Sequence, residues 1–132
     1  MTEIIKSSLG ISSKVNTSIW VTFQKIGYHK YPNAPKDVDY LESRHRHLFK
    51  FRVSITVHHD EREIEYHQFL NKILSWYETD LEVNNSSCET IARLLVEKIR
   101  LDYDCSRRVV SVEVSEDGEC GSVVTSSPWS GI

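Results

Sequence analysis

Residues 45–57, with the sequence HRHLFKFRVSITV, decide the fold of this chain. The odd-numbered positions hold histidine or apolar residues, and the even-numbered positions are mostly polar or charged. Because successive side chains of a β-strand point to opposite faces, this alternation predicts a long strand with one face in the core. The apolar face begins with His45 and His47, so both imidazoles project toward the same side of the sheet.

Segments on either side of this strand complete the plan of the fold. Residues 18–26 are rich in β-branched and aromatic side chains and predict a strand. Apolar residues recur at helical spacing over 63–78 and again over 86–101, which predicts two helices. A further strand is predicted from about Arg108, and residues 121–125 are expected to form a short returning strand. The order ββααββ predicts an α+β fold, an antiparallel four-stranded sheet with two helices on one face.

Composition predicts one globular domain, residues 1–132. The chain is 39% hydrophobic and 27% charged, which is ordinary for a soluble domain of this length. A net charge of −3 argues against a nucleic-acid partner. The 3 cysteines show no CxxC spacing, and the sequence has neither an apolar signal segment nor a long apolar run. We therefore expect a cytoplasmic protein without a membrane partner.

Three histidines form a candidate metal site. His45 and His47 project from one strand face, and His29 lies in a predicted loop that starts at Gly27 and leads toward this strand. Three imidazoles with one open position are a common form of catalytic zinc site. The sequence therefore predicts Zn²⁺ bound by His29, His45 and His47. The alternative is that these are hydrogen-bonded histidines at the rim of the core.

Two glutamates are candidates for ligand binding. Glu116 continues the apolar register of the last long strand, and a carboxylate facing the core is costly unless it is paired. Such a carboxylate suits the guanidine-like edge of a purine or pterin, which it can grip with two hydrogen bonds. Alternatively, the strand has ended and Glu116 is a solvated turn residue. Glu89 follows Ser86 in a capping-box pattern, so it either caps the second helix or contacts a ligand.

Taken together, these residues resemble the family of 6-pyruvoyl-tetrahydropterin synthase and 6-carboxytetrahydropterin synthase, over about residues 18–125. The family has a loop histidine after its first strand, a His-Gly-His at the start of its second strand, a Pro-Thr-x-Glu-Asn-like helix start and a late Val-x-Val-x-Glu. The matching places hold His29, His45-Arg46-His47, Ser86-Ser87-Cys88-Glu89-Thr90 and Val112-Glu113-Val114-Ser115-Glu116.

The resemblance implies a fold, an assembly and a set of roles. Family members adopt the tunnelling fold, in which subunits join their sheets into a barrel with active sites at the interfaces. A homo-oligomer, a tetramer or hexamer, is therefore expected. The histidines become zinc ligands, Glu116 becomes the pterin anchor, and Glu89 and Ser87 become further substrate contacts.

The chain departs from the family pattern near His45, the first histidine of its His-x-His. The family cysteine four residues before that histidine is replaced by Leu41. A variant branch instead uses a glutamate three residues before it, and Glu42 stands there, so it is the candidate catalytic base. The family's Asp-His pair between the helices is absent, and Arg46 replaces the family glycine.

These observations lead to three functional hypotheses. The first is a zinc-dependent lyase that acts on a dihydropterin such as dihydroneopterin triphosphate, with Glu42 as the base. The second is a non-catalytic protein that binds or sequesters a pterin-, purine- or nucleotide-like small molecule, since the usual proton relay is missing. The third is an interaction module whose histidines only line the rim of the core.

Overall fold

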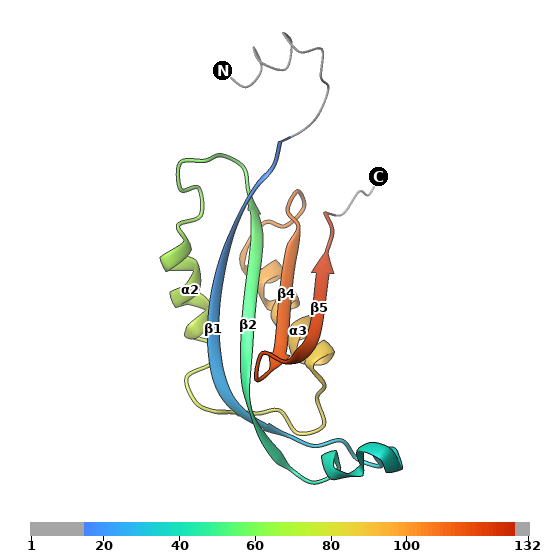
Figure 1. Ribbon diagram of the computed structural model, residues 1–132. Helices are drawn as coiled ribbons and strands as arrows, with labels where there is room; N and C mark the ends of the chain where they lie inside the picture. The colour runs from blue at the N-terminus through green and yellow to red at the C-terminus, as the bar shows by residue number, and fades with distance from the viewer. Residues whose placement is uncertain (1–14, 129–132) are drawn as a thin grey trace.

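The computed structural model describes residues 15–128, which form one open β-sheet with helices against one of its faces (Figure 1). The strands are β1 (Thr17–His29), β2 (His45–Val57), β3 (Leu81–Glu82), β4 (Val110–Glu116) and β5 (Cys120–Ser126). The helices are the 3₁₀ segment η1 (Lys36–Leu41), α2 (Tyr66–Leu74) and α3 (Cys88–Asp102).

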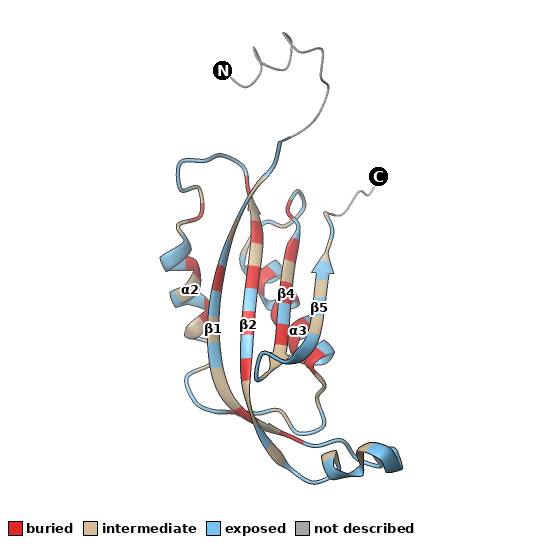
Figure 2. Cartoon of the chain, viewed as in Figure 1, coloured by how far each residue is buried: buried red, intermediate tan, exposed pale blue. Residues whose placement is uncertain are grey.

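The described strands pair in the order β3-β1-β2-β4-β5. The pairs β1–β2, β2–β4 and β4–β5 are antiparallel, and the short β3 runs parallel to β1. The prediction for β2 is confirmed, because the strand spans His45–Val57 and its buried residues alternate with more exposed ones (Figure 2). Phe51, Val53 and Ile55 of this strand are almost completely buried.

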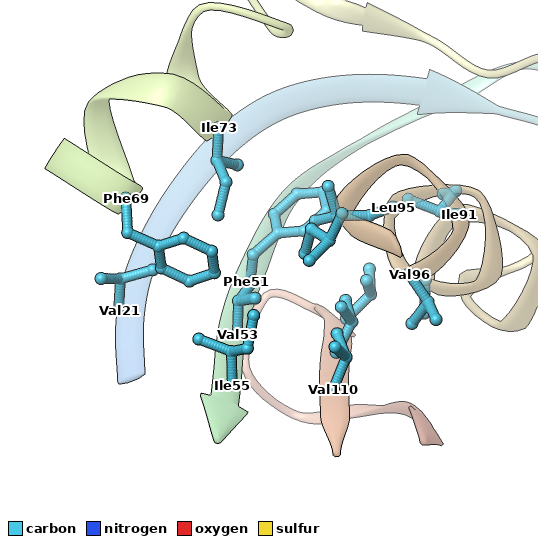
Figure 3. Close-up of a cluster of buried hydrophobic side chains, with 14 of the residues drawn as sticks. Val21, Phe51, Val53, Ile55, Phe69, Ile73, Ile91, Leu95, Val96 and Val110 are labelled. Carbon is cyan, nitrogen blue, oxygen red and sulfur yellow. The ribbon is translucent and has the colours of Figure 1, made fainter. Parts of the chain in front are cut away.

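The helices α2 and α3 cover the face of the sheet to which the odd-numbered residues of β2 point. Phe69 and Ile73 of α2 and Leu95 of α3 are fully buried, and they belong to the same apolar cluster as Phe51 and Val53 (Figure 3). Removing this apolar surface from water supplies most of the driving force for folding. The predicted α+β class is confirmed. Among the described residues, no helix combines the length and apolar character that a membrane crossing requires.

The first strand is longer than the sequence predicted, and this moves His29 out of the expected loop. β1 continues through Gly27 to His29, which is its last residue. Gly27 is a site of close approach, since a Cβ atom there would lie 2.6 Å from the ring of Phe49. The glycine that suggested a loop therefore makes room for a core aromatic side chain inside a strand.

Helix α2, Tyr66–Leu74, is shorter than the predicted span 63–78. It begins at Tyr66, because the side chain of Glu65 accepts the N–H of His67 and caps the helix. Glu63 lies before the helix and pairs with Arg108.

The second helix begins at Cys88, and its N-cap is Ser87, whose Oγ accepts the N–H of Thr90. The capping box predicted for Ser86 and Glu89 is therefore wrong by one residue. The two-residue strand β3 was not predicted, so the described sheet has five strands instead of four.

Candidate metal centre

Three histidines meet where β1 ends and β2 begins. His29 and His45 are direct partners in the antiparallel register, and His47 lies two residues further along β2, opposite Gly27. Ring centroids are 4.6 Å apart for His29 and His45, 4.9 Å for His45 and His47, and 5.3 Å for His29 and His47. Each residue offers one ring nitrogen, and these nitrogens lie within 4.8 Å of one another. The strand register thus brings together the predicted ligand residues, which can bind a metal ion.

Backbone carbonyls hold two of these rings through their Nδ1 atoms. Nδ1 of His29 lies 3.0 Å from the carbonyl oxygen of Ser86. Nδ1 of His45 lies 2.8 Å from the carbonyl oxygen of Ser43. Because a carbonyl oxygen can only accept, each Nδ1 carries a proton and donates it. In the neutral ring, Nε2 then carries the free lone pair, and a neutral imidazole binds a metal ion through such a nitrogen.

The third ring is held by a carboxylate. Nδ1 of His47 lies 2.7 Å from Oδ2 of Asp117, so it too carries a proton. Its Nε2 is buried and has no hydrogen-bond partner among the described residues. Buried polar atoms without a partner are rare and call for an explanation. A metal ion bound at this nitrogen supplies one.

Glu116 faces two of the same nitrogens. Its Oε1 lies 3.1 Å from Nε2 of His29, and its Oε2 lies 3.4 Å from Nε2 of His47. When both rings are neutral and protonated at Nδ1, these contacts join acceptors to acceptors, which repel unless a cation or a proton lies between them. The donor set therefore fits a cation. Glu116 is the last residue of β4 and is paired, so it is not the solvated turn residue of the alternative interpretation.

A cleft of about 540 Å³ adjoins the histidines. His29, His45 and Glu116 form part of its wall. The remaining described residues that line it are Lys30, Tyr31, Leu41, Asn85, Ser86, Ser87, Cys88, Glu89, Cys120, Gly121 and Ser122. The cleft therefore lies between the histidines, the start of α3 and the start of β5, and it has the size range of small-molecule sites.

Glu89 and Ser87, the predicted substrate contacts at the start of α3, both line this cleft. Glu89 does not cap the helix. Instead it accepts a hydrogen bond of 2.8 Å from Oγ of Ser122, and this bond lowers the pKa of the Glu89 carboxyl. Ser87 uses its Oγ as the helix cap, where it accepts the N–H of Thr90 at 3.2 Å. Glu89 thus presents a negative charge to the cleft, while Ser87 is engaged in the helix itself.

Two cysteines line the cleft, and the sequence analysis gave them no role. Burial, with the nearby Glu116 and Glu89 carboxylates, raises the pKa of the Cys88 thiol to about 12, so it stays protonated at neutral pH. Cys120 is exposed and pairs with Glu116 across the β4–β5 hairpin. Cys88 lies at the start of α3, within the predicted helix start, whereas only the pairing of β4 with β5 reveals the position of Cys120.

Glu42, the candidate catalytic base, does not line the cleft of the single chain. It is exposed and follows η1, where its backbone N–H donates to the carbonyl of Asp39. Leu41, the residue that replaces the family cysteine, does line the cleft. Within the described residues the structure therefore brings together His29, His45, His47, Glu116, Glu89 and Ser87, but not Glu42.

Asp117 is the residue near the histidines that sequence reasoning missed. In the sequence, Asp117-Gly118 is only a turn signal, although Asp117 directly follows Glu116. Because β4 pairs with β2 up to Glu116, opposite Phe49, the next residue lies beside Leu48, and its carboxylate contacts His47.

The chain was also compared with known proteins, and neither the protein-family models nor the curated sequences gave a match.

Proposed function

We propose that the chain is a zinc protein of pterin chemistry, a lyase that acts on a dihydropterin such as dihydroneopterin triphosphate. His29, His45 and His47 hold the ion, and the adjoining cleft receives the heterocycle. The observation that carries this proposal is the shared arrangement of the three imidazoles. Each Nδ1 is bound by an oxygen, and the metal-binding nitrogens lie within 4.8 Å of one another.

The cleft has the chemistry to hold such a heterocycle. Glu116 and Glu89 supply carboxylates on its wall, and the aminopyrimidine edge of a pterin offers two adjacent N–H donors to one carboxylate. When bound, Zn²⁺ supplies a Lewis acid that lowers the pKa of a neighbouring O–H or C–H group of the substrate. Glu116 orients the ring, and Glu42 accepts the proton.

Glu42 needs a partner chain to take part, since it is exposed and does not line the cleft of its own chain. We therefore include in the proposal a tunnelling fold that assembles as a homo-oligomer, a tetramer or hexamer, in the cytoplasm. The antiparallel order β1-β2-β4-β5 and the unpaired outer edge of β5 in the described sheet support this assembly. An interface beside the histidines would bring Glu42 of one subunit to the cleft of another.

A second candidate function is binding without turnover. Two observations favour it: Leu41, which has no acid–base chemistry, lines the cleft, and Glu42 does not. Such a protein would hold a pterin-, purine- or nucleotide-like small molecule through the metal ion and Glu116.

The experiment uses the zinc-loaded wild type and its Glu42→Gln variant. Product formation from dihydroneopterin triphosphate is followed by chromatography, and binding of the same compound is measured by calorimetry. The lyase predicts turnover in the wild type that is lost in Glu42→Gln with binding retained. Glu61→Gln, an exposed change at the other end of β2, is the matched control.

Other outcomes separate the alternatives. Stoichiometric binding without product in either protein favours the binding function. Absence of zinc by elemental analysis, both after purification and after reconstitution, overturns both candidates and leaves the interaction module.

A further inference from the structure

Asp117 differs from the other residues that accept a hydrogen bond from an Nδ1 atom of these histidines, because it does so with a charged side chain. We propose that Asp117 is a positioning residue that keeps His47 in the Nδ1–H form and thereby sets the metal affinity of the centre. This inference rests on the metal site of the proposed function and is independent of its substrate.

The carboxylate of Asp117 is fixed by the chain itself. Its Oδ2 accepts from Nδ1 of His47 at 2.7 Å, and its Oδ1 accepts the backbone N–H of Leu48 at 2.9 Å. Its own backbone N–H donates to the carbonyl of Leu48 at 2.8 Å. Three hydrogen bonds therefore tie Asp117 to His47 and Leu48, so the carboxylate has little freedom to turn away from the ring.

The backbone of Asp117 adopts an uncommon conformation to reach this position. Its φ angle is +59°, in the left-handed region that β-carbon-bearing residues rarely enter, although Asp and Asn enter it more readily than most. Both oxygens of the side chain accept hydrogen bonds, one from the N–H of Leu48 and one from Nδ1 of His47, so the group acts only as an acceptor toward the ring.

The other two rings show what a carboxylate adds. The Nδ1 atoms of His29 and His45 donate to the neutral carbonyls of Ser86 and Ser43. A hydrogen bond to a carboxylate is stronger and raises the basicity of the opposite nitrogen, which strengthens its bond to a metal ion. The nitrogen made more basic is Nε2 of His47, the buried atom without a hydrogen-bond partner among the described residues. Among the three ligands, His47 is therefore the one whose metal-binding nitrogen a charged partner on Nδ1 makes more basic.

The Asp117→Asn variant tests this role with a nearly isosteric change. Its side-chain oxygen still accepts from Leu48, and Asn tolerates the left-handed backbone, so the turn is retained. The amide N–H₂ now faces Nδ1 of His47, where two donors cannot meet. The ring must move its proton to Nε2, and the lone pair for the metal is lost. Competition with a chelator should show zinc affinity reduced about 10- to 100-fold.

Glu119→Gln is the matched control, because it removes the same charge from the same turn. The side chain of Glu119 is exposed and has no hydrogen bond or ion pair within the described chain. A general loss of negative charge would lower affinity alike in both variants, whereas the positioning role predicts a loss in Asp117→Asn alone. Equal zinc affinity in Asp117→Asn and wild type would overturn the inference, as would an equal loss in both variants.

A measurement on the metal-free protein tests the tautomer directly. Long-range ¹H–¹⁵N spectra, recorded where the imidazoles are neutral, should assign the Nδ1–H form to His47 in the wild type and the Nε2–H form in Asp117→Asn. His29 and His45 should keep the Nδ1–H form in both proteins. An Nε2–H form of His47 in the wild type contradicts the inference. Because this result needs neither zinc nor substrate, it remains decisive if the proposed function fails.

Discussion

The two ends of β2 bury polar side chains in opposite ways. At the end near Val57, Arg108 is bound by both oxygens of Glu63, by the carbonyl of Thr56 and by the carbonyl of Asp104. Each of its nitrogens has an acceptor within the chain, so this network serves the fold.

At the other end, the three histidines use only one ring nitrogen each for hydrogen bonds within the fold. Their remaining nitrogens converge beside a cleft, and the described part of the chain offers them only the carboxylate of Glu116. The contrast indicates that buried polar atoms without a hydrogen-bond partner point to a functional site, whereas buried polar atoms that are all paired within the chain stabilise the fold.

The largest effect is expected at the Val57 end of β2, where loss of the Arg108–Glu63 pair should lower the stability of the fold. Arg108→Met removes one partner of a largely buried ion pair and leaves Glu63 without its guanidinium. Breaking such a pair costs about 3 kcal/mol, so urea unfolding should show this loss of stability. Zinc affinity should stay unchanged, because the pair lies at the opposite end of β2. A variant with wild-type stability would refute the structural role.

The second largest effect is expected from a comparison of one histidine at each end of β2. His45→Gln removes a proposed ligand and should lower zinc affinity by at least about 100-fold, the upper end of what loss of a supporting residue costs. His58→Gln, at the exposed far end of β2, is the control and should bind zinc like the wild type. Chelator competition measures both. Similar affinities in the two variants would show that the histidine cluster is not the metal site.

Low pH should destabilise the fold at the Val57 end of β2, because the Glu63 carboxylate that pairs with Arg108 becomes protonated. Its hydrogen bonds with Arg108 and with the N–H of His58 lower the pKa of this carboxyl from 4.5 to about 2. A lowered pKa in the folded state means that the stabilisation is complete above about pH 5 and is lost as the pH falls toward 2.

Urea unfolding between pH 5 and pH 2 should therefore show a loss of about 2 kcal/mol that is absent in Glu63→Gln. An identical pH dependence in the two proteins would exclude Glu63 as its source.

The smallest effect concerns Glu116, which lies between the metal centre and the cleft. Glu116→Gln should lower the affinity for dihydroneopterin about tenfold, because one charge-assisted hydrogen bond is weakened. Zinc affinity should change by less than about threefold if Glu116 serves the heterocycle alone. Calorimetry with each ligand separates the two. A large fall in zinc affinity would instead make Glu116 a ligand of the ion.

The sequence predicted the centre of the sheet well because β2 has one strongly apolar face. A period-two pattern fixes both the bounds of a strand and the face of each residue, so His45 and His47 were placed correctly. The continuation of an apolar register predicted the position of Glu116 in the same way. These features follow from local periodicity, which a sequence displays directly.

Other features depend on contacts between distant residues and were missed. The two-residue strand β3 is too short to have a pattern. Gly27 suggested a loop, because the ring of Phe49 that requires a glycine there lies on another strand. Asp117 gave only a turn signal, since its partner His47 is 70 residues away. The base role of Glu42 remains a prediction.

The ring of Phe49 links the hydrophobic core to the metal centre. It is fully buried, it covers Gly27, and its centroid lies 5.2 Å from that of His29 and 5.9 Å from that of His47. One ring thus packs against both the hydrophobic core and the candidate metal site. A side chain at position 27 would displace this ring, so such a substitution should change the stability of the fold and the placement of His29 and His47 together.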